Sequence, residues 1–485
     1  MHVRTTTTTS IALFCMSKTS TIHMNNSVKR GLHLHGHKSR AVPVAFDAHN
    51  HIHLSKDGGI PPLSRDEMMM MMVPVLGKTD GRGSCTTSTA ETTILDVTDM
   101  TLHARNIMNA MKNHPSPSRP TGTATDEQHD DTNMNIVDEK DATSALMKLE
   151  LGGMALMSTQ PRDFPIVRKL SDAMLNDFNS IHDDDDDNEE GASGSDQAVQ
   201  VVRCYGVHPW FLRQANEDFA FMHNGMSDNE SSLSSPASAS ASTPSASIPW
   251  LPYLAHTLQS DPASHVGEIG LDGARYEINP TTNEKVLVST MESQIEAFEA
   301  QMHLAADLRK CVSVHAVQCW GPLMDSLRRI KVVRSLMRKE RRALKRQLEV
   351  GTSLDVLEKY KEVEEDVLIL PPKVYFHAFG GKTAVIDQLD AICRDEKNSN
   401  SSEEMIETFY GFAPVVNFRS PKTASVIQKV GIGRLVLESD LEDYSNVMGD
   451  LKANAEFIAE ALEMEVDEVL CRTHDNARRL YGLGC

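Results

Sequence analysis

The feature that most constrains the fold is a repeated order in which a short apolar run is followed by a longer stretch of helical pattern. Eight runs rich in Val and Ile have the composition of buried strands, and they occupy residues 44–52, 152–159, 200–208, 265–271, 311–317, 373–379, 408–414 and 434–440. Helical patterns occupy residues 143–150, 163–175, 248–259, 288–309, 319–346, 382–395, 421–430 and 446–463. This alternation predicts a parallel sheet that is buried on both faces. Eight such units predict an α/β fold, a (β/α)8 TIM-type barrel, rather than an open sheet.

The predicted barrel is interrupted by several insertions. The chain has 485 residues, of which 40% are hydrophobic and 5% aromatic, so part of it is not expected to enter a core. We predict a disordered tail or presequence over residues 1–43 and a single barrel domain over residues 44–485. The expected insertions, disordered or helical, lie at about residues 55–142, 180–198, 223–247, 335–368 and 396–404. Two of them contain the acidic run 183–190 and the Ser/Ala/Pro-rich segment 226–247, which are typical of solvated spacers.

The charge balance limits how the chain can contact other molecules. It has 48 Lys and Arg against 68 Asp and Glu, which gives a formal net charge of -20. A chain this acidic is not expected to bind nucleic acid over its whole surface, because the phosphates would be repelled. Any contact with DNA is therefore expected to be local. No run reaches the roughly 18 apolar residues of a membrane helix, so a membrane is not an expected partner.

Cysteine usage and the amino terminus bear on the compartment. The eight cysteines show no CxxC pairing, which is typical of free thiols in a reducing compartment, and we predict a cytoplasmic or nuclear protein. Residues 1–45 contain no acid and six Lys or Arg. That composition is compatible with targeting to an organelle and equally with a disordered tail.

Side chains that bind metals stand at the carboxyl-terminal ends of the predicted strands, where the active sites of such barrels form. His49 and His51 share one face of the first strand because side chains alternate along a strand, so both can contact one ion. Later strands end in, or carry, His208, Glu268, His315, His377 and Asp440. Burying this many ionisable groups together without a counter-ion costs several kcal/mol. The set therefore predicts a divalent-metal site.

These motifs resemble the TatD family of metal-dependent deoxyribonucleases and hydrolases, in the amidohydrolase-like superfamily. The matching segments, in chain order, are FDAHNH, YGVHPWF, VGEIGLD, QIEAFEAQMHLA, VSVHAVQ, YFHAFGG, LVLESD and NARRLYG. They cover residues 44–54, 152–220 and 250–485 with the inserts excepted. YGVHPWF and VSVHAVQ look more like the eukaryotic TatD-related subgroup, of which some fungal members are described as interaction partners of cell-cycle proteins.

The resemblance implies a role for each of these side chains. One divalent ion would be held by His49, His51, Glu268 and Asp440. A second would be held by Glu268, His315 and His377, so that Glu268 bridges the two. His208 would contact the substrate phosphate, and Asp440 would accept the proton of the attacking water. The ions would be Mg²⁺, Mn²⁺ or Zn²⁺.

Two positions depart from the family pattern. Two residues after His315, where the family often has Arg, the chain has Val317, and His53 stands where Asp is frequent. Both departures concern substrate preference rather than metal binding.

The resemblance implies an enzyme, a metal-dependent hydrolase that cleaves DNA phosphodiester bonds with water activated by two metal ions. Two alternatives remain open at this stage. One is hydrolysis of a small amide or ester substrate in the same site. The other is an interaction scaffold that retains the barrel and binds protein partners through its inserts. The sequence leaves the oligomeric state open.

A strongly basic stretch follows the fifth predicted strand. Residues 328–346 contain ten Lys or Arg and one acid, Glu340. The stretch could lie along a phosphate backbone near the barrel mouth. We favour a charged helical hairpin, because residues 355–366 carry six acids and two bases and could fold back on it.

Overall fold

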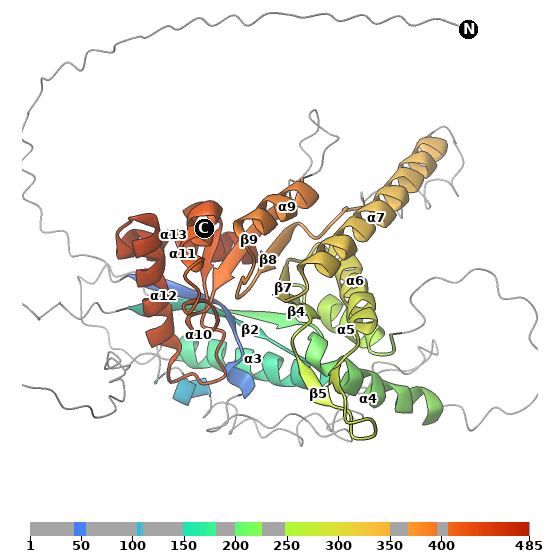
Figure 1. The fold of residues 1–485 in the computed structure, drawn as a ribbon, viewed down its shortest axis with the longest axis horizontal. Coiled ribbons are helices and arrows are strands. Elements are labelled where there is room, and N and C mark those ends of the chain that lie inside the picture. Colours follow the sequence, from blue (N-terminus) through green and yellow to red (C-terminus); the bar gives the residue numbers. More distant parts are fainter. Residues whose placement is uncertain are drawn as a thin grey trace, which may run out of the picture. The chain divides into compact units, whose positions relative to one another are not determined.

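The computed structural model describes residues 43–54, 104–107, 109, 149–180, 199–225, 248–349, 367–394 and 406–484. A parallel sheet of eight strands, in the order β1-β2-β3-β4-β7-β8-β9-β10, runs through them (Figure 1). Its strands are β1 (Val44–Asn50), β2 (Glu150–Met157), β3 (Gln200–Tyr205), β4 (His265–Asp272), β7 (Val312–Val317), β8 (Lys373–Phe376), β9 (Glu407–Phe412) and β10 (Leu435–Leu437). Every predicted strand is confirmed.

The first and last strands meet and close the sheet into a barrel. Just beyond β10, the amide of Asp440 donates to the carbonyl oxygen of His49 at 3.0 Å. In the same seam, the carboxylate of Asp47 accepts the amide and the hydroxyl of Ser439 at 3.0 and 2.6 Å. The (β/α)8 fold is therefore confirmed, and its closure brings the first and last sequence motifs together.

The helices that cover the sheet are α3 (Phe164–Ser180), α4 (Leu212–Gly225), α5 (Leu251–Ser260), α6 (Met291–Asp307), α7 (Trp320–Glu349), α9 (Thr383–Cys393), α10 (Pro414–Asn417), α11 (Thr423–Val430), α12 (Val447–Leu462) and α13 (Val466–Tyr481). The prediction of a helix over 143–150 is wrong at its last residue, because Glu150 begins β2 and pairs with Val44. The helices α4 and α13 and a hairpin of β5 (Tyr276–Ile278) and β6 (Lys285–Leu287) were not predicted. No helix in the described ranges is long and apolar enough to cross a membrane.

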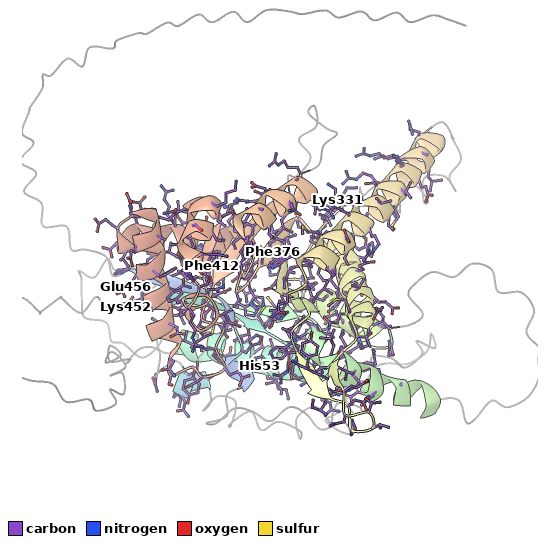
Figure 2. The ribbon with its side chains drawn as sticks, in the orientation of Figure 1. His53, Lys331, Phe376, Phe412, Lys452 and Glu456 are labelled. Atoms are coloured by element: carbon purple, nitrogen blue, oxygen red, sulfur yellow. The ribbon has the colours of Figure 1, made fainter. Side chains whose placement is uncertain are left out.

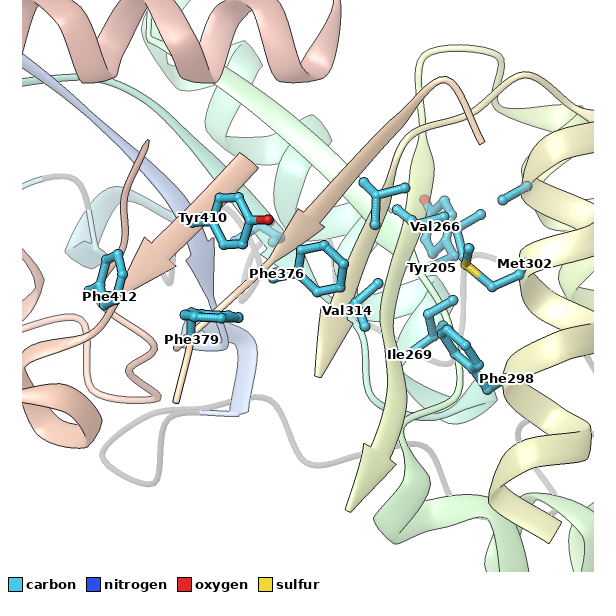
Figure 3. Close-up of a cluster of buried hydrophobic side chains, with 14 of the residues drawn as sticks. Tyr205, Val266, Ile269, Phe298, Met302, Val314, Phe376, Phe379, Tyr410 and Phe412 are labelled. Atoms are coloured by element: carbon cyan, nitrogen blue, oxygen red, sulfur yellow. The ribbon is translucent and has the colours of Figure 1, made fainter. Parts of the chain in front are cut away.

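The strands are apolar on both sides because each side faces a core. Outside the sheet, Ile269 lies beside Phe298 and Met302 of α6, and Phe376, which stacks with Tyr410, belongs to the same larger core cluster (Figure 3). Tyr375, next to Phe376, belongs instead to a second cluster made mainly of strand residues. Since successive side chains of a strand alternate between its faces, a strand of a closed barrel reads as a continuous apolar run.

Helix α13 completes the second cluster. Its apolar residues Ala477, Leu480 and Tyr481 belong to that cluster. The hydroxyl of Tyr481 donates to the carbonyl oxygen of Ala48 in β1 at 2.7 Å. The last motif of the chain is therefore structural and supports the strand that carries the histidine pair.

Helix α6 holds the ends of two strands in place. The amide group of Gln294 bonds both the backbone N–H and the carbonyl of Asp272, at 2.7 and 3.0 Å. Gln301, two turns later, does the same for Val207, at 2.8 and 3.2 Å. Both glutamines are buried. These two contacts explain the QIEAFEAQ motif, because its first and last residues fix the backbone at the carboxyl-terminal ends of β4 and β3.

The predicted insertions are only partly described. Residues 104–107 are helical, and Ala104 and Ile107 are buried in the larger core cluster. The interpretation of 55–142 as largely disordered is wrong at these residues, because they add apolar side chains to the core. The insert at 335–368 is helical as far as the end of α7 at Glu349.

The remaining inserts lie outside the described residues. So do the tail, the spacers 183–190 and 226–247, and the acidic segment 355–366 of the proposed hairpin. The division into a tail and one barrel domain stays a prediction.

Candidate metal centre

The structure brings all the predicted site residues together at the carboxyl-terminal ends of the strands. All six histidine and glutamate side chains are less than a tenth exposed, and His315 is the most exposed of them at 9%. They come from five different strands or the turns that follow them, and Asp440 adds a sixth. The members are His49, His51, His208, Glu268, His315, His377 and Asp440.

Glu268 lies at the middle of this set. Its Oε2 faces β1, at 3.1 Å from Nε2 of His51 and 3.5 Å from Nε2 of His49. Its Oε1 faces the opposite side, at 2.6 Å from Nε2 of His377 and 2.9 Å from Nδ1 of His315. One carboxylate thus presents a different oxygen to each of two groups of nitrogen atoms.

We call the first group, His49, His51 and Asp440, the β1 side. The Nε2 atoms of the two histidines are 3.2 Å apart. Oδ1 of Asp440 lies 3.8 and 3.9 Å from them. Asp440 has a left-handed backbone, φ 55°, which an Asp tolerates better than most residues.

Neutral groups orient the two rings of the β1 side. Nδ1 of His51 donates to the carbonyl oxygen of Met157 at 3.0 Å, so the lone pair of the neutral ring is on Nε2. Nδ1 of His49 is 3.0 Å from the hydroxyl oxygen of Ser313. Both rings therefore turn Nε2 toward the same space. Two imidazole nitrogens and a carboxylate that converge in this way fit a divalent cation.

We call the second group, His208, His315 and His377, the β7 side. Nδ1 of His315 is 3.2 Å from Nε2 of His377. The other nitrogen of His315, Nε2, is 3.1 Å from Oδ2 of Asp272. That carboxylate accepts the Nε2–H and leaves the Nδ1 lone pair of His315 facing Glu268. A carboxylate–histidine pair of this kind is typical of metal centres.

Asp272 is the functional residue that sequence reasoning missed. It is the last residue of the VGEIGLD motif, and that position in a motif was the available signal. Gly270 of the same motif has φ 152°, and a Cβ there would collide with the backbone carbonyl of His315. The motif therefore brings β4 close enough to β7 for Asp272 to reach the His315 ring.

His208 differs from the other histidines in its tautomer. Its Nδ1 accepts the backbone N–H of Trp210 at 3.2 Å. A backbone N–H can only donate, so the neutral ring carries its proton on Nε2, which is 3.3 Å from Oε1 of Glu268. Burial lowers the pKa of His208 to about 4, which keeps the ring neutral. His208 is thus arranged as a hydrogen-bond donor, although its nitrogen lies within ligand distance of the centre.

The charge of Glu268 dominates the electrostatics of the centre. Burial alone would raise its pKa, but electrostatic interactions with the surrounding histidines and hydrogen bonds with His208 and His315 hold the pKa well below its usual range. Burial lowers the pKa of His51, but Glu268 outweighs burial and raises the pKa to about 9. For His315, the hydrogen bonds with Asp272 and Glu268 likewise outweigh burial and raise the pKa to about 9. The centre therefore attracts positive charge.

Among the described residues, three sets of side chains place their ligand atoms within 4.8 Å of one another. They are His49–Glu268–His377, His49–His51–Asp440 and His208–Glu268–His315. The donor set fits one or two divalent ions. The allocation of ligands to two ions stays a prediction.

His53, one of the two departures from the family pattern, lies beside the centre and outside these sets. It is fully buried (labelled in Figure 2). Its Nε2 is 3.9 Å from Oδ2 of Asp163. Its ring centroid is 6.2 Å from that of His51.

Comparisons with known proteins agree with the motifs. The family model described as TatD related DNase matches residues 131–482. The Cut9-interacting protein scn1 of Schizosaccharomyces pombe is 21% identical over 366 residues, which cover 72% of this chain and 97% of that protein. Among solved structures, an uncharacterized amidohydrolase from Saccharomyces cerevisiae is 13% identical, with a TM-score of 0.39 and coverage of 68% of this chain and 89% of that chain. A TatD homologue from Escherichia coli is 17% identical, with a TM-score of 0.39 and coverage of 69% and 88%.

Proposed function

The chain belongs to the family of TatD-related DNases, which are hydrolases, and we propose that it is a deoxyribonuclease that hydrolyses DNA phosphodiester bonds at the metal centre. The observation that carries the proposal is the position of Glu268. Its two carboxylate oxygens face two adjoining groups of nitrogen atoms, at distances from 2.6 to 3.5 Å. A bridging carboxylate between two ligand groups is the arrangement that a two-metal hydrolase needs.

The β1 side and Glu268 would hold one divalent ion, and Glu268, His315 and His377 would hold the second. Such ions supply an activated water and neutralise the charge that develops on a phosphate during displacement. Imidazole nitrogens make up most of the donor set, which favours Zn²⁺ over Mg²⁺.

Two side chains of this protein would act on the substrate and the water. Asp440 is the base: its side chain is 17% exposed, so it is the member of the β1 side most open to a water molecule. Burial raises the pKa of its carboxyl group, which makes it a better proton acceptor than an exposed Asp. His208 is the contact for the substrate phosphate, because the proton on its Nε2 can be donated to a phosphate oxygen.

A protein-binding role is the alternative that a specific observation favours. The fission yeast relative is named as an interacting protein of Cut9. Binding of a protein partner does not require the metal centre to be chemically competent, so the two functions are separable by mutation.

The test is elemental analysis of the purified full-length chain, together with cleavage of an end-labelled DNA strand and of a panel of amides and esters. We expect bound divalent metal, DNA cleavage that chelation abolishes, and loss of cleavage in Glu268→Gln. Metal-loaded protein that hydrolyses amides or esters but not DNA would replace the proposed substrate class. Metal-loaded protein with neither activity would favour the protein-binding role.

A further inference from the structure

An exposed aromatic side chain stands at the rim of the metal centre. Trp210 follows His208 by two residues in η4 (Pro209–Phe211). It is 36% exposed, whereas Trp250 is 1% exposed. The Trp210 ring centroid is 4.9 Å from that of His208 and 6.1 Å from that of His315. A single exposed aromatic is ordinary on a protein surface, so its exposure alone assigns nothing.

The indole is oriented by the carboxylate that also contacts His315 of the metal centre. Its Nε1–H donates to Oδ2 of Asp272 at 2.7 Å. The same oxygen lies 3.1 Å from Nε2 of His315. A single carboxylate oxygen therefore joins a side chain open to solvent to a buried histidine beside Glu268. A ring used only for packing needs neither this exposure nor this connection.

An arginine accompanies the indole. Oδ1 of Asp272 accepts the backbone amides of Ala274 and Arg275, at 2.6 and 2.9 Å, and so shapes the turn after β4. The guanidinium carbon of Arg275 lies 4.6 Å from the centroid of the Trp210 ring. Within the described part of the chain, Arg275 forms no ion pair with a carboxylate. Arg213, three residues after Trp210, is also exposed, but it forms an ion pair with Glu277.

The same combination is repeated one residue further along the chain. Tyr276 begins β5 and is 42% exposed. Nζ of Lys285, from the paired strand β6, lies 4.3 Å from the centroid of its ring. Two aromatic–cation pairs thus follow one another from the metal centre onto the β5–β6 hairpin. In a chain with a net charge of -20, a cation such as Arg275, which has no ion pair among the described residues and lies on the indole at the rim of the centre, is a local exception.

We propose that Trp210 and Arg275 form a nucleotide subsite next to the scissile phosphate, which presupposes the proposed action on DNA. A base stacks on the face of the indole opposite Arg275, and the guanidinium binds the phosphate of that nucleotide. Every base has a face that can stack, so this contact does not select a sequence. Asp272 bonds both Trp210 and His315, and His315 contacts Glu268. Asp272 therefore fixes the position of the subsite relative to the proposed metal ligands.

The first experiment measures binding without metal, so that it does not depend on catalysis. Quenching of tryptophan fluorescence by a short DNA strand is followed in metal-free protein and in Trp210→Phe. We expect the quenching to decrease strongly in Trp210→Phe, because Trp210 is the most exposed of the three tryptophans: Trp250 is buried, and Trp320 is only partly exposed and packs against Phe379. Quenching that is unchanged in Trp210→Phe, or no quenching at all, overturns the subsite.

The second experiment compares a normal DNA strand with one that has an abasic nucleotide at the cleaved position. In the wild type we expect the abasic strand to have a KM about 5- to 150-fold higher, which is the range for loss of one stacked base. In Trp210→Ala this difference between the two strands should disappear, and Trp210→Phe should restore part of it. Trp210→Ala that discriminates between the strands as well as the wild type overturns the subsite.

Matched arginine variants test the phosphate contact. Arg275→Ala should weaken binding of both strands and reduce the salt dependence of binding, since it removes one phosphate contact. Arg213→Ala is the control and should bind as the wild type does. Equal effects of the two variants would remove Arg275 from the subsite. Cleavage of DNA without any role for Trp210 would leave the proposed deoxyribonuclease standing, whereas Trp210-dependent binding without cleavage would leave the subsite standing and overturn the deoxyribonuclease.

Discussion

The two sides of the metal centre are built from the same kinds of ligand but are oriented by different groups. On the β1 side, a carbonyl oxygen of Met157 and a hydroxyl of Ser313 contact the outer nitrogens of His51 and His49. On the β7 side, the carboxylate of Asp272 contacts His315. The β1 side is attached to the seam that closes the barrel, and the β7 side is attached to the exposed rim. If the proposed roles hold, this difference predicts that metal binding and substrate binding are coupled mainly through the β7 side.

A charged acceptor also changes the ligand itself. A carboxylate that accepts the outer N–H of a histidine makes the inner nitrogen a stronger donor to a metal, whereas a neutral acceptor mainly sets the ring orientation. We therefore expect changes to the β7 side to alter metal affinity and substrate binding together. Changes to the β1 side should alter the metal and the proton transfer.

The largest effect is expected where the two sides meet. Glu268→Gln keeps the size of the side chain but removes the negative charge that both sides share. We expect loss of at least one metal ion and of nearly all hydrolysis, measured by elemental analysis and a cleavage assay. Glu456→Gln, on the exposed surface of α12 (Figure 2), is the control and should retain both. Wild-type activity with two bound metals in Glu268→Gln would contradict the proposed bridge.

The next largest effect separates proton transfer from metal holding on the β1 side. Asp440→Asn retains an oxygen that can contact an ion but removes the base. Loss of a general base typically lowers the rate by about 10²–10⁴-fold. We expect that loss in single-turnover cleavage, with part of the metal retained by the remaining ligands. Cleavage at the wild-type rate would mean that Asp440 is not the proton acceptor.

A paired comparison tests the contrast between the two orienting groups. Asp272→Asn removes a charged partner of His315, and such a change typically costs about 10–100-fold in metal affinity or activity. Ser313→Ala removes only a neutral partner of His49 and should cost less. Competition titrations with a metal indicator would measure both affinities. Equal losses, or a larger loss in Ser313→Ala, would contradict the distinction between the sides.

The smallest effect is expected at His208, whose proton faces the centre. His208→Ala should raise KM for DNA by about tenfold, the cost of one hydrogen bond to a charged group. Metal content should stay at the wild-type level, because the tautomer places a hydrogen and not a lone pair on Nε2. Loss of metal in His208→Ala would show instead that His208 is a ligand.

The barrel could be predicted because its strands are local patterns. The run 373–379 is apolar at successive positions. In the structure, Phe376 belongs to the larger core cluster outside the sheet, and Tyr375 belongs to the second cluster, made mainly of strand residues. Helix α13 was missed although its buried residues, among them Val469, Leu480 and Tyr481, recur at helical spacing. Six of its sixteen residues are charged, and it follows α12 with no strand between them, so it falls outside the alternation of strands and helices. The helical turn with Ala104 and Ile107 was missed because the insert 55–142 was interpreted as a whole and is mostly polar, although apolar residues are frequent close to the turn.

By itself, the sequence determined which ligand-type side chains end the strands, because that depends only on strand pattern and on the residues at each strand end. Only the tertiary structure decided which nitrogen of each imidazole faces Glu268. Those nitrogens are chosen by partners far away in the chain: Met157 is 106 residues from His51, and Ser313 is 264 residues from His49. A hydrogen bond depends on a distance of about 3 Å and on direction, and neither is present in a linear pattern until the barrel has closed.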